Sequence, residues 1–347
     1  MPNSIVVSRG CPHSCDFCYK ESFFAGGKAF YVQAVDKALA EIERLPGRHL
    51  YFLDDNLFGS PPFADTLFDC MRGMGRVWQA AGTVQAVLRP GLLERAVDAG
   101  LRSLFVGFET LDPDNLRAQH KPQNLPDRFT PTFPPRKHGD GLRRPAHPYE
   151  LAIRRLHDLG VMVNASFVFG MDHDDPTAFD RTVEWALRQG VATATFHILT
   201  PYPGTVLHRR LAAEGRITSC DWDRYDTRHA VFEPARLSRA ELEAGYLRAY
   251  RDFYSWRGIL QASRVHQTTR ERLRHAAYTA GWKKMEPFWD IAIRHGRVHR
   301  LLPLLETILA GSGERAVKTM PDFRSRLSPA RANASSRSRT AAVGRYV

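Results

Sequence analysis

Three of the five cysteines lie within eight residues, in the stretch SRGCPHSCDFCYK (residues 8–20). Cys11, Cys15 and Cys18 follow the spacing C-x3-C-x2-C, and three thiolates this close together are typical of a metal site. Structural zinc usually takes four protein ligands, but no second CxxC pair follows, and His13 lies too close to the cysteines to serve as the fourth. A [4Fe–4S] cluster with three cysteine ligands leaves one iron open for a substrate or cofactor. We favour this second interpretation.

The other two cysteines, Cys70 and Cys220, stand alone, and we expect each to be a small buried hydrophobic residue without a ligand role. An odd total with one tight cluster does not fit the disulfide framework of a small secreted domain. No apolar run approaches the roughly 18 residues needed to span a bilayer. The N-terminal stretch MPNSIVVSRG also lacks the basic and apolar regions of a signal peptide. These features predict a cytoplasmic protein without a membrane span.

The formal net charge of +12 raises the question of an anionic partner. Half of this charge comes from residues 324–345, which hold six arginines and no acidic residue. Because it is rich in Ser, Ala and Arg and lacks hydrophobic periodicity, the stretch 324–347 is predicted to be a disordered basic tail. The charge is therefore weak support for nucleic-acid binding, which we do not expect.

Short β-rich runs alternate with helical patterns along the first part of the chain. Between two of these runs, Val32, Val35, Leu39 and Ile42 repeat at helical spacing, which predicts a helix over residues 32–45. Strict alternation of strand and helix predicts an α/β fold with a parallel sheet, and six such units make a partial (β/α)6 TIM-like barrel. Barrels of this kind place their chemistry at the C-terminal ends of the strands. The predicted strands cover residues 4–8, 49–54, 83–87, 103–109, 161–170 and 193–199.

Two segments depart from this alternation. Residues 119–148 hold seven prolines and no apolar period, so we predict a long loop that either covers the mouth of the barrel or is a neutral insertion. Further along, the pattern becomes wholly helical, and Ser238 with Glu241 has the sequence of a capping box. We therefore predict a barrel over residues 1–215 and a mainly helical C-terminal extension over residues 216–323.

The cysteine loop resembles the C-x3-C-x-aromatic-C motif of the radical S-adenosylmethionine (SAM) superfamily, with Phe17 as the aromatic residue. Later stretches that follow predicted strands, FLDDNLFG, FVGFETLD, VFGMDHD and LTPYPGT, are similar to segments of the same superfamily. The resemblance covers about residues 1–215. It implies that Cys11, Cys15 and Cys18 hold a [4Fe–4S] cluster and that SAM is the ligand of the open iron.

The resemblance also implies an enzymatic mechanism. In this superfamily, an electron from the reduced cluster cleaves SAM to methionine and a 5′-deoxyadenosyl radical, which abstracts hydrogen from a substrate. The protein positions the cofactor and excludes water. A ferredoxin or flavodoxin is implied as the reductant, and the basic surface could dock such an acidic partner. The sequence assigns no catalytic residue, because His13 and His197 are expected to be structural.

Further residues after the first two strands are implied in SAM binding. Phe17 and Tyr19 flank the last cysteine and would line the adenine, with ordinary loop packing as the alternative. Asp54, Asp55 and Asn56 offer oxygens for the amino group of SAM. A polar turn after a strand is the alternative for each of these three residues.

The later strands add candidates of the same kind. Glu109 ends an otherwise apolar strand and would contact a ribose hydroxyl. Asn164 and Ser166 share one strand face by the period of two, and would hold the ribose or the methionine end. Gly170 and Pro201 would let the backbone approach the adenine closely. Simple turn chemistry is the alternative for the last two.

The stretches DDNLFG and TPYPGT, with the region that follows them, look like radical SAM proteins that carry a cobalamin-binding domain. These include methylases of unactivated carbon and ring-forming enzymes of pigment biosynthesis, so methylation or ring formation is the implied reaction. The cluster loop begins at residue 11, so we expect no cobalamin domain ahead of it. The Asp-x-His-x-x-Gly signature of cobalamin binding is also absent. Cobalamin is thus expected only from a separate subunit or through contacts that the sequence does not reveal.

Two other functions fit parts of the sequence. A tRNA methylthiotransferase would share the barrel and suit the positive charge, but should carry three more cysteines and an RNA-binding barrel. A non-catalytic zinc or iron–sulfur module would use the same cysteines. It would bind no SAM, and as an electron carrier it would need a fourth cysteine. No feature of the sequence indicates the substrate.

Overall fold

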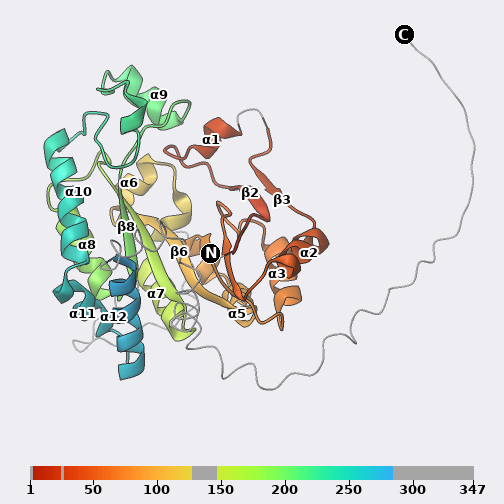
Figure 1. Cartoon of the computed structure of the whole chain (residues 1–347). Coiled ribbons are helices and arrows are strands. Elements are labelled where there is room, and N and C mark those ends of the chain that lie inside the picture. Colours follow the sequence, from red (N-terminus) through yellow and green to blue (C-terminus); the bar gives the residue numbers. More distant parts are fainter. Residues whose placement is uncertain (1–2, 25–26, 127–146, 284–347) are drawn as a thin grey trace, which may run out of the picture.

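The structure is a computed structural model that describes residues 3–24, 27–126 and 147–283 (Figure 1). Six parallel strands form one sheet in the order β1-β4-β5-β6-β7-β8, and β2 and β3 form a separate antiparallel hairpin. In the described part, β1 pairs only with β4 and β8 only with β7, so the sheet is open, as in a partial barrel. The strands are β1 (Asn3–Ile5), β2 (Ser8–Gly10), β3 (Phe30–Val32), β4 (His49–Phe52), β5 (Val77–Gly82), β6 (Leu101–Glu109), β7 (Met162–Phe169) and β8 (Thr193–Ile198).

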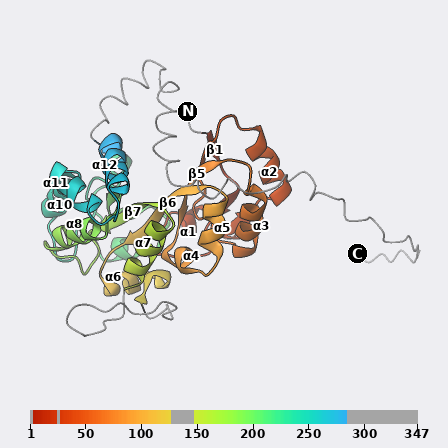
Figure 2. The same cartoon turned by 90° about the horizontal axis from the view of Figure 1, so that it is seen from below.

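Helices follow the strands and cover the outside of the sheet, as the view from below shows (Figure 2). Helices α2 and α3 lie at the β1 end, and α8, α10, α11 and α12 lie at the β8 end. The helices are α1 (Lys20–Phe23), α2 (Val35–Arg44), α3 (Pro61–Met71), α4 (Val84–Leu88), α5 (Leu92–Asp98), α6 (Pro113–Ala118), α7 (Pro148–Asp158), α8 (Ala178–Arg188), α9 (Val206–Ala213), α10 (Arg239–Phe253), α11 (Trp256–Ser263) and α12 (Thr269–Lys283), with 3-10 turns η1 (Pro122–Asn124) and η3 (Trp222–Arg224).

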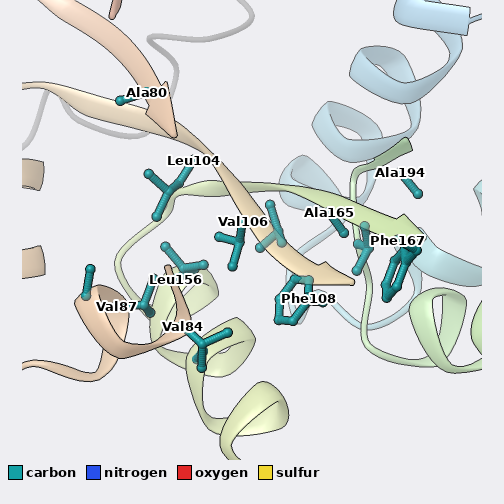
Figure 3. Packing of buried hydrophobic residues seen from close by; sticks show 14 of the residues in the cluster. Ala80, Val84, Val87, Leu104, Val106, Phe108, Leu156, Ala165, Phe167 and Ala194 are labelled. Carbon is teal, nitrogen blue, oxygen red and sulfur yellow. The ribbon is translucent and has the colours of Figure 1, made fainter. Parts of the chain in front are cut away.

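The two faces of the sheet differ in chemistry because side chains alternate along each strand. On the outer face, Leu104, Val106 and Phe108 of β6 are fully buried. Figure 3 shows them beside Val84 of α4 and Leu156 of α7. Burying each large apolar side chain stabilises the fold by about 1.5–3 kcal/mol. The outer face therefore holds the core, and the inner face is left for smaller and polar residues.

Two tyrosines at the C-terminal end of α10 cover the edge strand β8. The hydroxyl of Tyr254 accepts from the backbone N–H of Ala194 at 3.0 Å and donates to its carbonyl at 2.9 Å. Tyr250 makes the same pair of bonds to Phe196, at 3.1 and 3.2 Å. These two tyrosines satisfy backbone groups of β8 that would otherwise invite another strand. The C-terminal helices are therefore part of the barrel structure.

The predicted strands at 49–54, 103–109, 161–170 and 193–199 are confirmed, but the prediction for 83–87 is wrong. That stretch is helix α4, and the strand is β5, just before it. Thr83 caps the helix by accepting a hydrogen bond from the backbone N–H of Ala86 at 3.2 Å. A capped turn with valines on one side is a helix start that the β-branched composition concealed.

The predicted first strand, residues 4–8, is divided between β1 and β2, and β2 pairs with β3 instead of joining the sheet. The capping box is confirmed, because Ser238 Oγ accepts from Glu241 N–H at 3.2 Å and Glu241 Oε2 accepts from Ser238 N–H at 2.8 Å. The predicted tail, the helices after residue 283 and residues 127–146 lie outside the described residues. Within the described residues, no helix combines the length and apolar character needed to cross a membrane.

Candidate functional site

The cysteine loop lies between β2 and α1, next to the C-terminal ends of the parallel strands. Cys15 is buried, Cys11 and Cys18 are partly buried, and none forms a disulfide. The backbone N–H of Cys18 donates to the carbonyl of Cys15 at 3.0 Å, which closes a turn. The N–H of Cys11 donates to the carbonyl of Ala29 at 3.1 Å, next to β3. Local turns and the β2–β3 hairpin therefore fix the cysteine positions.

The loop after β4 holds the strand that leads into the cysteines. Asp54 Oδ1 accepts from the backbone N–H of Val7 at 3.2 Å and from Ser8 Oγ at 2.5 Å, and it also accepts from the N–H of Ser8. Asp55 accepts from the N–H of Gly10 at 2.8 Å and from the hydroxyl of Tyr19. Both carboxylates therefore act on the loop itself.

Each of the three cysteine sulfurs accepts a hydrogen bond. Asn56 Nδ2 donates to Cys11 Sγ at 3.5 Å, and Gln123 Nε2 donates to Cys15 Sγ at 3.3 Å. The backbone N–H of Lys20 makes the corresponding bond to Cys18. Hydrogen bonds to sulfur stabilise thiolates and are a main control of iron–sulfur chemistry. The surroundings are thus suited to cysteines that act as anionic ligands.

Buried polar atoms without partners gather in the same place. Within the described residues, Asn56 Oδ1, Gln123 Oε1 and both amide atoms of Gln119 make no hydrogen bond. Each such atom costs free energy unless a further group satisfies it. Their position around the cysteines is consistent with a ligand that this site would bind.

A buried ion pair forms one wall of the site. Lys121 Nζ lies 2.5 Å from Glu109 Oε1, and Ser166 Oγ donates to Glu109 Oε2 at 3.5 Å. Lys121 Nζ also lies 5.8 Å from the ring centre of Phe17. Burial opposes the charged form of Lys121, but the charge and hydrogen bond of Glu109, together with Cys15 and Cys11, outweigh burial, so the pKa of Lys121 is raised. Its charge also acts on Cys15, where it favours the thiolate.

The backbone is shaped to make room for this pair. Glu109 has a φ of 67°, a conformation that side chains other than glycine seldom adopt. The register between β6 and β7 shifts between Gly107 and Glu109. A Cβ at Gly107 would come 2.3 Å from Glu109 Oε1, so only glycine leaves space for the carboxylate. Strain of this kind is found at functional sites.

The thiols of Cys15 and Cys18 would lose their protons at neutral pH only when a metal is bound. Burial raises the pKa of Cys15 and raises the pKa of Cys18 to about 11. Both would be protonated at neutral pH without a metal, and a bound metal ion deprotonates a coordinating thiol. Three thiols with hydrogen-bond donors therefore fit an iron–sulfur group.

The donor set does not fit a single ion. Over residues 3–24, 27–126 and 147–283, no three His, Cys, Asp or Glu side chains are arranged around one point where a metal ion could bind. In a cubane cluster, each cysteine binds a different iron, so the three sulfurs surround a cluster instead of one ion.

The predicted SAM-binding residues are only partly brought together. Glu109 and Ser166 meet beside the cysteine loop, and Phe17 is partly buried under Lys121. Tyr19 is 48% exposed, and both burial and its bond to Asp55 raise the pKa of the phenol. Their roles in binding SAM stay predictions.

Two of the predicted residues have protein partners in the structure, and their roles in binding SAM stay predictions. Asp54 is 3% exposed, and its carboxylate accepts hydrogen bonds from Val7 and Ser8. Asn164 Nδ2 donates to Ser103 Oγ at 2.8 Å. Because Ser103 lies near the start of β6, Asn164 points toward the N-terminal ends of the strands, away from Glu109.

The predicted backbone positions serve packing and turns. At Gly170, φ is 97° and a Cβ would come 2.7 Å from Leu242 Cδ2, so protein atoms already fill the space beside it. Pro201 is buried in the loop before α9. In the same loop, Gly204 approaches Ser22 of α1, where a Cβ would come 2.8 Å from Ser22 Oγ. This loop therefore contacts the helix that follows the cysteines.

Both histidines near the site have defined positions. His13 is partly buried, and burial with the charges of Lys121 and Lys20 lowers its pKa. His197 Nδ1 lies 3.2 Å from Thr227 Oγ1, and burial lowers its pKa against the opposing charge of Glu109. No contact of either histidine assigns it a catalytic role.

Lys121 and Gln123 were missed by the sequence analysis because they fall in the proline-rich segment predicted as a loop. The first part of that segment continues from α6 into η1, and Gln123 is 7% exposed. The carbonyl of Gln119 accepts from the N–H of Asp16 at 3.1 Å, which joins this segment to the cysteine loop. No local sequence pattern indicated that these residues reach the cysteine loop.

The sequence of the chain matches a family of known proteins. The family model of the radical SAM superfamily matches residues 5–186, just over half of the chain. The chain belongs to the radical SAM superfamily. Membership implies a [4Fe–4S] cluster and SAM as cofactors, and the chemistry of a radical SAM enzyme. A second family model, a domain of unknown function named DUF4070, matches residues 205–301.

Relatives of this radical SAM protein are of two kinds. It is 28% identical over 263 residues to bacteriochlorophyllide d C-12(1)-methyltransferase of Chlorobaculum tepidum, covering 74% of this chain and 52% of that protein. It is 24% identical over 269 residues to anaerobic magnesium-protoporphyrin IX monomethyl ester cyclase of Cereibacter sphaeroides, covering 73% and 40%. The chain spans about half the length of the curated relatives it matches.

A solved structure supports the fold. The cobalamin-dependent SAM radical enzyme OxsB, with aqua-cobalamin and SAM bound, superposes with a TM-score of 0.53 over 83% of this chain and 46% of that chain. The sequence identity of 12% limits this likeness to the fold. The partial barrel predicted from strand–helix alternation is confirmed.

Proposed function

We propose that Cys11, Cys15 and Cys18 hold a [4Fe–4S] cluster whose fourth iron binds SAM, and that the enzyme abstracts hydrogen from its substrate. The observation that carries this proposal is the set of hydrogen-bond donors on the three sulfurs, together with the unpartnered amide atoms around them. When bound, a reduced cluster and SAM supply a one-electron cleavage that generates a hydrogen-abstracting radical.

The residues of the chain have three tasks in this proposal. The thiolates bind iron, and the amides of Asn56 and Gln123 orient and stabilise them. Asn56 Oδ1 has no hydrogen-bond partner in the described structure. Of Asp54, Asp55 and Asn56, Asn56 is therefore the residue that would accept a hydrogen bond from the SAM amino group. Glu109 is held by Lys121 and would accept from a ribose hydroxyl.

We further propose that the reaction ends in methylation or ring formation, as the names of the two relatives suggest. A ferredoxin or flavodoxin would supply the electron. A non-catalytic iron–sulfur module remains the competing function. It differs from the proposal in that it would not bind or cleave SAM.

Reductive cleavage of SAM tests the proposal. The chain, reconstituted anaerobically with iron and sulfide, is incubated with dithionite and SAM, and 5′-deoxyadenosine and methionine are quantified by mass spectrometry. We expect both products from the wild type and from the control C70S, and neither from C15S. Equal amounts from wild type and C15S would reject the assignment of the cysteines, and no products from the wild type would favour the binding module.

A further inference from the structure

A pocket lies at the opposite end of the strands from the cysteine loop. It has a volume of about 380 Å³ and is lined by the C-terminal end of α7, the turn into β7, Ala192 before β8, and the first half of α12. Because β7 begins at Met162, these residues mark the N-terminal ends of the strands. The size is at the lower end for small-molecule sites.

Three histidines form one side of this pocket. His266 Nε2 lies 3.0 Å from His275 Nδ1, and the ring centres of His157 and His266 are 4.9 Å apart. Burial lowers the pKa of His157 to about 4 and that of His275 to about 3, so both are neutral at pH 7. In the described structure these rings do not surround a common point where a metal ion could bind.

Two side chains that line the pocket have nitrogens without a partner. His275 is 4% exposed, and its Nε2 makes no hydrogen bond with any described residue. The buried Nε of Arg274 likewise has no partner there, although Nη2 of the same guanidinium donates to the carbonyl of Gly160 at 3.3 Å. Buried nitrogens of this kind are normally satisfied by protein, water or ligand.

Arg274 lies close to a second guanidinium. Burial lowers the pKa of Arg274, and the nearby charge of Arg102 lowers it further, while the charge of Glu271 opposes both. Two acidic residues line the pocket, Glu271 and Asp158. The carboxylate of Glu271 accepts from the N–H of Thr268 at 3.2 Å at the start of α12, and Asp158 is exposed. A partly buried guanidinium beside a second one is stabilised by an anion.

We propose that this pocket binds a small organic anion, whose carboxylate or phosphate oxygens accept hydrogen bonds from Arg274 Nε and His275 Nε2. Such a ligand selects the tautomer in which His266 donates to His275 Nδ1 and His275 carries its proton on Nε2. The apolar walls formed by Leu159, Val161 and Ala192 would contact the organic part of the ligand. Bound there, the anion joins α12 to the start of β7.

Thermal unfolding of the reconstituted full chain tests this site, with inorganic phosphate and acetate as separate probes and sodium chloride at equal ionic strength as the reference. A ligand that binds only the folded state raises the unfolding midpoint in a saturable way. We expect this rise with at least one probe. Losing one charge-assisted hydrogen bond should weaken binding about tenfold or more in R274Q and H275Q. The control R264Q, an exposed arginine near the end of α11, should respond like the wild type.

Hydrogen–deuterium exchange on the wild type provides a test that does not depend on variant folding. The effective probe should slow exchange in peptides from the α7–β7 turn and from α12, and should leave the cysteine loop unchanged. Midpoints equal to those in chloride for both probes would overturn the proposal. So would an unchanged response in R274Q, or protection confined to other parts of the chain.

Discussion

Lys121 Nζ and Glu109 Oε1 lie 2.5 Å apart, and each side chain is about nine-tenths buried. The two residues come from different segments, since Glu109 ends β6 and Lys121 follows α6. The pair therefore fixes the segment that carries Gln123 against the end of a barrel strand. This contact places the donor to Cys15 at the cysteine loop.

Replacing Lys121 with methionine should strongly destabilise the fold. K121M leaves the carboxylate of Glu109 buried without its partner, which typically costs about 3–5 kcal/mol. We expect a loss of this size in the free energy of unfolding, measured by urea denaturation under anaerobic conditions. The double variant E109Q/K121M should be less destabilised than the sum of the two single changes, because the pair is coupled.

An exposed ion pair supplies the control for this change. Arg188 and Glu184 lie 3.3 Å apart on α8, with side chains 59% and 67% exposed. R188M should therefore cost less than about 1 kcal/mol. If K121M cost no more than R188M, the ion pair would not hold this part of the site.

Each cysteine of the loop should be needed to retain iron. C11S, C15S and C18S each remove one thiolate, so reconstituted protein should lose most of its iron and acid-labile sulfide. Both contents are measured colorimetrically per chain. C70S and C220S change cysteines outside the loop and should keep the wild-type content. A loop variant with full iron content would show that its cysteine is not a ligand.

The amide of Gln123 should raise the reduction potential of the cluster. Its N–H donates to Cys15 Sγ, and hydrogen bonds to sulfur stabilise the more negative, reduced state. Q123L should lower the midpoint potential in an EPR-monitored redox titration. Q33L is the control, because Gln33 Nε2 donates to Glu41 Oε1 at 2.7 Å and not to a sulfur. Equal potentials for Q123L and Q33L would contradict the assigned role.

Asp174 should make stability depend on pH between about 4 and 6. Its carboxylate accepts from the N–H groups of Gly170 at 2.9 Å and Met171 at 3.1 Å, yet burial raises its pKa to about 6. An aspartate in the unfolded chain has a pKa of about 3.9, so the folded state holds this proton more tightly. The contribution of Asp174 to the free energy of unfolding is therefore fully present below about pH 4. It is lost as the pH rises through about 6.

D174N should remove this part of the pH dependence, about 2–3 kcal/mol between the two ends of the window. Urea unfolding at pH 4 and pH 6.5 measures it. Asp54, whose pKa burial also raises to about 6, remains in the variant and keeps some dependence in the same window. D223N, at an exposed site, should leave the wild-type profile unchanged. Equal slopes for D174N and wild type would show that Asp174 titrates alike in both states.

The sequence predicted the parallel strands where periodicity was clear, and failed where local composition opposed the final structure. The valines after Thr83 favoured a strand, but they face the core from a capped helix, as Figure 3 shows for Val84 and Val87. The β2–β3 hairpin was missed because its strands have three residues each and are separated by residues 11–29, and because Val32 of β3 was assigned to the following helix.

The same division holds for the site. The cysteines were predictable because their spacing is local. Lys121 and Gln123 reach the site only through the fold of the segment after α6, and no local pattern indicates a contact between Gln123 and Cys15. Asp54 was assigned from its position after a strand, but its oxygens are used by the neighbouring strand, which depends on the register of β1 with β4.

The electron paramagnetic resonance spectrum of the anaerobically reconstituted and reduced chain, recorded with and without SAM, tests the central proposal most directly. We expect a [4Fe–4S]⁺ signal that shifts when SAM is added, because SAM would bind the iron that the three cysteines leave open. A protein that retains only zinc, or a cluster signal that SAM leaves unchanged, would contradict the proposal.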